Sequence, residues 1–342
     1  MRLLICPLDY TGDGRVSHTG LHISSMNTAK VLFNSGIDVQ VRPIVGGTKP
    51  VRSNLKGALL KDLITQLNPS HVVTCAFWMP VDDMKLVCSQ NPNVKFAVNC
   101  HSNIAFLQVE PGGLKMLRDY IDLEMTSLNF FVSGNCQDFV NAINGSWRAP
   151  CQYLPNLYYI DQLTPVNQNL FCGGTLRIGE FGALRPFKNH TVAAWAALGI
   201  AGALNTNLEF YVNTRDDGGG KRILAALHSI LDNLPYAKLI EIPWQNWPDH
   251  RRLVRHMHLL IQPSFTETFL LVAADAVTEG VPVVGSNVIE WLPRHWQADP
   301  DDVEDVVRVG LQLLNDRRAQ QQGIRALQRN NEIGISSWRN FL

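Results

Sequence analysis

Short apolar runs alternate with helical patterns along this chain, and this alternation limits its fold more than any other feature. Runs typical of strands lie at residues 3–5, 71–74 and 96–99, and helical patterns lie between strands at 22–34 and 55–67. Strands that alternate with helices pair in parallel, because each helix returns the chain to the start of the next strand. The first half of the chain therefore predicts an α/β domain with a parallel sheet.

The pattern is interrupted at residues 154–165, where proline and turn-forming residues are too frequent for a strand or helix. It then restarts with strand-like runs at 175–179, 208–212, 238–242 and 259–262. A chain of 342 residues is long enough for about two domains. We predict two Rossmann-like domains that face a central cleft, with the domain boundary inside the interruption.

Composition narrows the class of protein further. Thirty basic residues balance thirty acidic ones, so the net charge does not point to a nucleic acid or an anionic membrane. The longest uncharged stretch, residues 191–208, holds too few apolar residues to span a membrane, and the N-terminus lacks the apolar run of a secretory signal. The seven cysteines are too widely spaced for zinc or redox motifs, which is typical of reduced thiols. These features predict a cytoplasmic protein without a membrane span.

The most informative motif lies at residues 262–284. Glu267 ends a loop, and a helix is predicted from Phe269 to Glu279, so the Glu267 carboxylate and nearby backbone N–H groups face one site. Asp275 follows eight residues later, which is about 80° around a helix and two turns deeper. Two acids at this spacing can bind two ends of one ligand. The alternative is that both are ordinary helix-start and surface acids.

This segment resembles the Glu-x7-Glu region of retaining glycosyltransferases of family 4, which have the GT-B fold. In that family a Pro-Ser loop precedes the first Glu, and Gly-Val-Pro-Val-Val follows the second, as in this chain. The resemblance implies that Glu267 binds the donor sugar and that Asp275, in place of the second Glu, holds the ribose of the nucleotide. It places the donor phosphate at the backbone of Thr268, Phe269, Leu270 and Leu271, with Leu270 replacing the usual Gly.

A second segment, residues 178–189, resembles the family's Gly-Arg-Leu-x-x-x-Lys motif. Gly182 and Lys188 match it, whereas Ala183 stands at the phosphate-binding Arg and Arg185 lies two residues later. Cleavage of a sugar–phosphate bond builds negative charge on the diphosphate, and fixed cations stabilise that charge. Lys188 would supply such a cation, with Arg185 as the candidate substitute for the phosphate-binding Arg. The alternative is that Lys188 is an exposed lysine at a helix start.

Three weaker matches complete the predicted site. Gly20 lies in a loop after the first strand that resembles the family's glycine loop, and His101 resembles its strand-end histidine, which contacts the donor sugar. Trp244 lies where the family holds the nucleobase. The alternatives are a structural histidine at His101 and a packing aromatic at Trp244.

Other polar clusters have simpler interpretations. Adjacent aspartates at 82–83, 216–217 and 301–302 look like metal ligands, but their contexts are typical of turns and helix caps. We therefore predict no metal site and no resident cofactor. The basic cluster at 250–255 is typical of a solvated helix face, with contact to nucleic acid as the alternative.

The resemblance implies a metal-independent, retaining glycosyltransferase with a nucleotide-sugar donor, a UDP-sugar by preference. Lys188, Glu267 and His101 would carry catalysis: Lys188 stabilises the leaving phosphate, which accepts the acceptor's proton, while the other two position the sugar. It assigns residues 1–160 to the acceptor and 170–320 to the donor, and residues 321–342 to a tail helix that returns to the first domain.

The sequence does not specify which molecule accepts the sugar. Segments 181–189 and 267–277 look most like compact viral glycosyltransferases, some of which add sugars to hydroxymethylated bases, so DNA is one candidate acceptor and the host cytoplasm the location if the chain is viral. Two alternatives share the predicted fold: a non-catalytic module that binds nucleotide-sugars, and a sugar-nucleotide epimerase.

Overall fold

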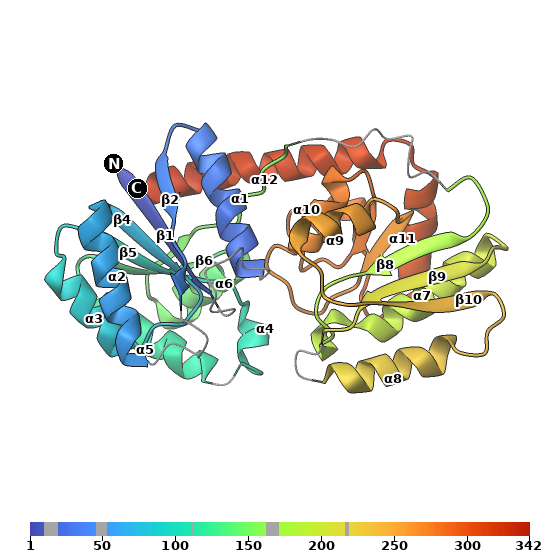
Figure 1. Cartoon of the computed structure of the whole chain (residues 1–342), viewed down its shortest axis with the longest axis horizontal. Helices are drawn as coiled ribbons and strands as arrows, with labels where there is room; N and C mark the ends of the chain where they lie inside the picture. The colour runs from blue at the N-terminus through green and yellow to red at the C-terminus, as the bar shows by residue number, and fades with distance from the viewer. Residues whose placement is uncertain (10–19, 46–52, 111, 162–170, 216–218) are drawn as a thin grey trace. The chain divides into compact units, whose positions relative to one another are not determined.

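The computed structural model describes residues 1–9, 20–45, 53–110, 112–161, 171–215 and 219–342 (Figure 1). The chain divides into two compact units. The first comprises Met1–Tyr159 together with Asn330–Leu342, and the second comprises Ile160–Arg329. The second boundary falls inside the last helix, so the residues of the predicted tail before Asn330 belong to the second unit.

A parallel sheet forms the centre of the first unit, with strand order β2-β1-β4-β5-β6-β7 and β3 also paired with β1. Its strands are β1 (Arg2–Asp9), β2 (Asp38–Val41), β3 (Ile44–Val45), β4 (His71–Cys75), β5 (Lys95–Cys100), β6 (Phe130–Gly134) and β7 (Cys151–Tyr153). Every pair in this sheet is parallel, which confirms the architecture predicted from the alternation. The chain leaves β1 toward β2 on one side and returns to β4 on the other, which defines a topological switch point.

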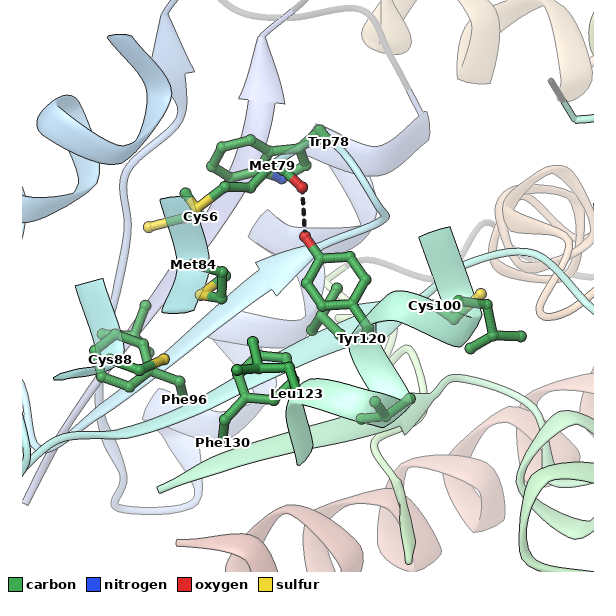
Figure 2. Close-up of a cluster of buried hydrophobic side chains, with 14 of the residues drawn as sticks. Cys6, Trp78, Met79, Met84, Cys88, Phe96, Cys100, Tyr120, Leu123 and Phe130 are labelled. Atoms are coloured by element: carbon green, nitrogen blue, oxygen red, sulfur yellow. Dashed lines mark hydrogen bonds between the residues drawn. The ribbon is translucent and has the colours of Figure 1, made fainter. Parts of the chain in front are cut away.

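Helices cover both faces of this sheet. They are α1 (Gly20–Asn34), α2 (Ser53–Leu67), α3 (Val81–Gln90), α4 (Ile104–Leu107), α5 (Gly113–Thr126) and α6 (Gln137–Ala142), followed by the π-helical turn η1 (Ile143–Trp147). On one face α2, α3 and α5 bury a large apolar cluster (Figure 2). Within it Tyr120 donates its hydroxyl to the Met79 carbonyl at 2.6 Å, which satisfies a polar group that would otherwise be buried without a partner.

The other face of the first sheet is covered by α1 and by the end of α12 (Ala319–Phe341). Trp338 and Phe341 pack in one buried cluster with Leu3 and Ile5 of β1. The Trp338 indole also donates to the Pro155 carbonyl at 3.0 Å. The last turns of the chain are therefore part of the core of the first unit.

The second unit has a five-stranded parallel sheet with the order β10-β9-β8-β11-β12. Its strands are β8 (Leu176–Glu180), β9 (Leu208–Asn213), β10 (Ala237–Ile242), β11 (Leu259–Gln262) and β12 (Val283–Gly285). Strand β8 is first in the chain and lies between β9 and β11. The chain leaves β8 toward β9 on one side and returns from β10 to β11 on the other, so the crevice at the carboxyl ends of β8 and β11 is where ligands bind in sheets of this kind.

The helices of the second unit pack closely around this sheet. They are α7 (His190–Ala203), α8 (Gly220–Leu231), α9 (Trp247–Val254), α10 (Leu271–Thr278), α11 (Val303–Asn315) and the first part of α12, with short 3-10 turns η3 (Pro186–Lys188) and η4 (Arg294–Trp296). The uncharged stretch noted in the sequence is the buried, alanine-rich helix α7. A side chain at Gly310 of α11 would lie 2.5 Å from Ile200, so this glycine allows α11 to approach α7.

The structure confirms the predicted helix cap at Asp302, whereas Asp82 and Asp83 lie in a helix and not in the predicted turn. Asp302 caps α11 by accepting from the N–H groups of Glu304 and Asp305, and Asp82 and Asp83 lie in the first turn of α3. Residues 216–217 lie outside the described residues. Within the described part of the chain, none of the helices has the length and apolar character needed to cross a bilayer.

Candidate functional site

Two loops meet at the switch point of the second unit, one after β8 and one after β11. The Phe265 N–H donates to the Phe187 carbonyl at 2.8 Å, and the Gln262 amide donates to the Phe181 carbonyl at 3.3 Å. Each bond joins a residue of one loop region to a residue of the other. Because both sequence motifs lie on these loops, the sheet order places them next to each other.

Lys188 and Glu267 form a buried ion pair between these loops. The Lys188 Nζ lies 2.5 Å from the Glu267 Oε1, and only 6% and 9% of the two side chains are exposed. The exposed-lysine alternative for Lys188 is therefore wrong. A buried ammonium needs a partner, because the surrounding protein solvates a charge poorly.

Gly182 makes room for the lysine. Its backbone has φ +116°, a conformation that only glycine adopts easily. A Cβ atom at this position would lie 3.3 Å from the Cε of Lys188. The Gly182 N–H donates to the Asn213 side chain at 3.0 Å, which fixes the loop to the end of β9. The structure thus brings Gly182, Lys188 and Glu267 together, although Lys188 and Glu267 are 79 positions apart in the sequence.

Two further buried residues, on which the charge of Lys188 acts, were not singled out from the sequence. Glu180 is the last residue of β8, His190 is the first residue of α7, and both side chains are fully buried, with 3.4 Å between Oε1 and Nδ1. Burial raises the pKa of Glu180 well above its usual range, against the opposing effect of Lys188. Burial, assisted by Lys188 and Arg185, lowers the pKa of His190 to about 3. A carboxylate at the carboxyl end of a predicted parallel strand, where ligands bind in such sheets, was the signal in the sequence.

The loop after Glu267 differs from the sequence prediction. Helix α10 begins at Leu271, not at Phe269, because Leu270 has a left-handed backbone with φ +55° and ends the loop. That conformation costs a non-glycine residue roughly 1–2 kcal/mol. Leu270 therefore keeps the backbone shape that glycine favours, although it replaces the family's glycine.

The side chains of this loop are mostly packed away. Phe269 and Leu270 are buried, and Phe269 stacks on Trp291 with ring centres 5.7 Å apart. Thr268 is half-buried. The backbone of Thr268 to Leu271 is consequently what this loop could offer to a phosphate. The helical angle predicted between Glu267 and Asp275 does not apply, since Glu267 lies outside α10.

Asp275 is buried on α10, with 1% of its surface exposed. Its Oδ1 accepts from the Trp247 indole at 2.8 Å, so α9 holds the carboxylate in place. The alternative that Asp275 is a surface acid is wrong.

The basic cluster of α9 is not a free cationic face. Arg251 and Arg255 pair with Glu279 of the second unit at 2.7 and 2.6 Å, and Arg252 pairs with Asp249. The prediction of a solvated basic face is therefore wrong for Arg251, which is 14% exposed. Because these charges are neutralised within the protein, the cluster gives little support to contact with nucleic acid.

Trp244 and Arg215 lie at the same edge of the sheet, two residues after β10 and β9. The Arg215 guanidinium stacks 4.7 Å from the Trp244 ring, which is 40% exposed. The Leu184 N–H donates to the Arg215 carbonyl at 2.8 Å, which connects this pair to the loop after β8. Trp244 is thus an accessible aromatic surface and not a core aromatic.

His101 and Gly20 belong to the first unit. His101 follows β5 at its carboxyl end, its Nδ1 lies 3.4 Å from the Asn135 amide, and burial lowers its pKa to about 4, so the ring is neutral. Gly20 is the first residue of α1, and the remainder of the predicted glycine loop lies outside the described residues.

A polar cavity of about 750 Å³ lies after β12, lined by residues that include Glu290, Arg294 and Asp299. Pro300 also lines it, and its carbonyl accepts from the Asn189 amide at 2.6 Å. One residue that lines the cavity is therefore hydrogen-bonded to the residue after Lys188.

Neither a protein-family model nor a curated protein sequence matches the chain. Solved structures do match it. The sucrose-phosphate synthase of Thermosynechococcus elongatus superposes with a TM-score of 0.69 at 14% identity, covering 98% of this chain and 95% of that one. A UDP-forming α,α-trehalose-phosphate synthase from Burkholderia xenovorans has a TM-score of 0.66 at 13% identity, with 99% and 97% covered.

TarM of S. aureus, whose structure was solved with UDP, has a TM-score of 0.61 at 14% identity. That similarity covers 83% of this chain, which spans only 58% of the TarM chain. Together with the two parallel-sheet units, these similarities show that the chain has the GT-B fold.

Proposed function

We propose that this protein is a retaining glycosyltransferase that moves a sugar from a nucleotide-sugar, by preference a UDP-sugar, to an acceptor hydroxyl. The buried Lys188–Glu267 pair at the switch point is the observation that carries the proposal. It supplies a fixed cation for a diphosphate and a carboxylate for sugar hydroxyls within one site. The names of two similar proteins, one UDP-forming and one solved with UDP, support the choice of nucleotide.

In the proposed reaction the diphosphate binds Lys188 and the backbone of residues 268–271. Lys188 stabilises the charge that develops on the departing phosphate, and Arg185 adds to the positive potential, as its effect on His190 indicates. These cations supply the charge that a divalent ion otherwise provides, so we propose metal-independent turnover.

Glu267 would bind sugar hydroxyls and not attack the sugar. Its carboxylate is held by an ammonium group at 2.5 Å, and an anion stabilised in this way is a weak nucleophile. We therefore favour front-face substitution, in which the leaving phosphate takes the proton of the acceptor hydroxyl. His101, neutral because of its burial, would contribute a hydrogen bond to the sugar.

For the other end of the donor, Asp275 would accept hydrogen bonds from the ribose while Trp247 holds it in place. Trp244 would stack on the base. The pairing of Arg251 and Arg255 with Glu279 weakens the case for a hydroxymethylated base in DNA as the acceptor.

The test is a panel of nucleotide-sugars incubated with and without acceptors, with release of nucleoside diphosphate and the anomeric configuration of the product as readouts. Transfer by the wild type, lost in Glu267→Gln and kept in Lys221→Ala, supports the proposal. Lys221 is an exposed lysine of the same unit and serves as the matched control. Binding of a donor without any transfer or hydrolysis would instead favour a non-catalytic binding module.

A further inference from the structure

A fully buried acid and a fully buried histidine lie close enough to the lysine of the proposed donor site for its charge to act on both. Both side chains of Glu180 and His190 have no exposed surface. Among the residues that the structure describes, neither carboxyl oxygen of Glu180 and neither ring nitrogen of His190 has a hydrogen-bond partner of good geometry. Buried polar atoms in this condition are rare, so the pair calls for a physical explanation.

The charges around Glu180 limit its protonation state. Lys188 is already paired with Glu267 at 2.5 Å. An ionised Glu180 would add a second buried carboxylate against one ammonium, which leaves a net negative charge without solvent to stabilise it. The Oε1 of Glu180 lies 3.4 Å from the His190 Nδ1, but burial keeps this histidine neutral, so it supplies no positive charge to offset an ionised Glu180.

The neighbouring elements supply no other cation that is shown to pair with Glu180. The strands on either side present the uncharged amides of Asn213 and Gln262 to the loop after β8. From α9, the His250 ring packs on Phe181, and burial lowers its pKa to about 4. Burial also keeps His190 neutral, and the positive charge of Arg185 lowers the pKa of His190 further.

We propose that Glu180 is a positioning residue of the donor site that stays protonated beside the neutral His190, so that Lys188 faces one carboxylate and the incoming diphosphate. This inference rests on the proposed function, because it names the charge state in which that site accepts a diphosphate. Ionisation of Glu180 would add a competitor for Lys188. Binding of the diphosphate and binding of the proton at Glu180 therefore strengthen each other.

The first test detects the proton on Glu180 directly. Infrared spectra of the wild type and of Glu180→Gln in heavy water, near neutral pH, should differ by one carboxylic-acid carbonyl band. Glu124, a buried acid of the first unit whose pKa burial raises to about 7, provides the control. Glu124→Gln should lose a different band and keep that of Glu180. Spectra that show only a carboxylate at Glu180 would overturn the inference.

The second test measures the coupling between the proton on Glu180 and the binding of the diphosphate. Calorimetry of UDP binding from about pH 6 to about pH 10 covers the range in which buried glutamates titrate. Wild-type affinity should fall by up to about tenfold per pH unit once Glu180 ionises, whereas Glu180→Gln should keep its affinity. The ionisation of UDP itself is common to both proteins, and Glu124→Gln should follow the wild type. Identical profiles for the wild type and Glu180→Gln would refute the coupling.

The two tests also separate this inference from the proposed function. If the wild type binds no nucleotide, the proposed function fails, while the infrared band still decides the state of Glu180. If Glu180→Gln does not fold, the wild-type binding enthalpy in buffers of different ionisation enthalpy counts the protons taken up. Above the terminal phosphate's pKa of about 6, uptake of a proton supports the inference, and its absence over the whole range contradicts it.

Discussion

Replacement of Lys188 by methionine should destabilise the second unit and strongly reduce turnover, for one electrostatic reason. Methionine keeps much of the side chain's length and its packing against Gly182 while it removes the charge. Glu267 would then be left as a carboxylate that is 9% exposed and lacks its ammonium partner. Breaking a buried pair in this way costs about 3–5 kcal/mol.

The change in melting temperature follows from that free energy. At roughly 2–4 °C per kcal/mol for a unit of this size, the second unit should melt about 6–20 °C lower than in the wild type. Turnover should fall by about two to three orders of magnitude, as is typical when one preorganised charge partner is removed.

A double-mutant cycle separates the two effects. Lys188→Met combined with Glu267→Gln leaves no unpaired charge, so it should recover most of the lost stability but none of the activity. Thermal unfolding and donor hydrolysis are measured on all four proteins, and Lys221→Met is the exposed-lysine control. An unchanged melting temperature in Lys188→Met, or simply additive losses in the double variant, would refute the argument that the pair is buried and coupled.

Three further predictions test other parts of the site and the fold. Asp275→Ala should weaken UDP binding by about 1.5–3 kcal/mol if it removes charge-assisted hydrogen bonds to the ribose; equal affinities in calorimetry would show that Asp275 does not hold the ribose. Because the pKa of Glu124 is raised to about 7 in the folded protein, its stabilising contribution is complete below its ordinary value and is lost as the pH rises through about 7. Denaturation at a series of pH values should therefore show a flatter profile for Glu124→Gln than for the wild type. Turnover should be unchanged by EDTA, since Lys188 and Arg185 supply the positive charge; a loss restored by Mg²⁺ or Mn²⁺ would contradict this.

The local sequence pattern was sufficient to predict the architecture of the two units. The alternation of apolar runs with helical segments predicts parallel sheets because strand and helix periodicities are properties of neighbouring residues. The cap at Asp302 was likewise visible in the sequence. The start of α10 was not, since no periodicity signals that Leu270 takes a left-handed conformation.

The site depended on contacts between distant parts of the chain. Lys188 and Glu267 could be selected from motifs, but their ion pair exists because β11 returns to the side of β8 across the switch point. Tertiary packing also decided that Arg251 and Arg255 neutralise Glu279 and do not form an open basic face.

The sequence by itself determined two parallel α/β units and the two motifs that carry the proposed donor site, because those features depend on the periodicity and identity of nearby residues. Only the tertiary structure decided the electrostatic state of the site. Whether Glu180 carries a proton depends on the loss of water around it and on the nearness of Lys188 and His190. Burial and charge separation are properties of the folded chain, and no local pattern specifies them.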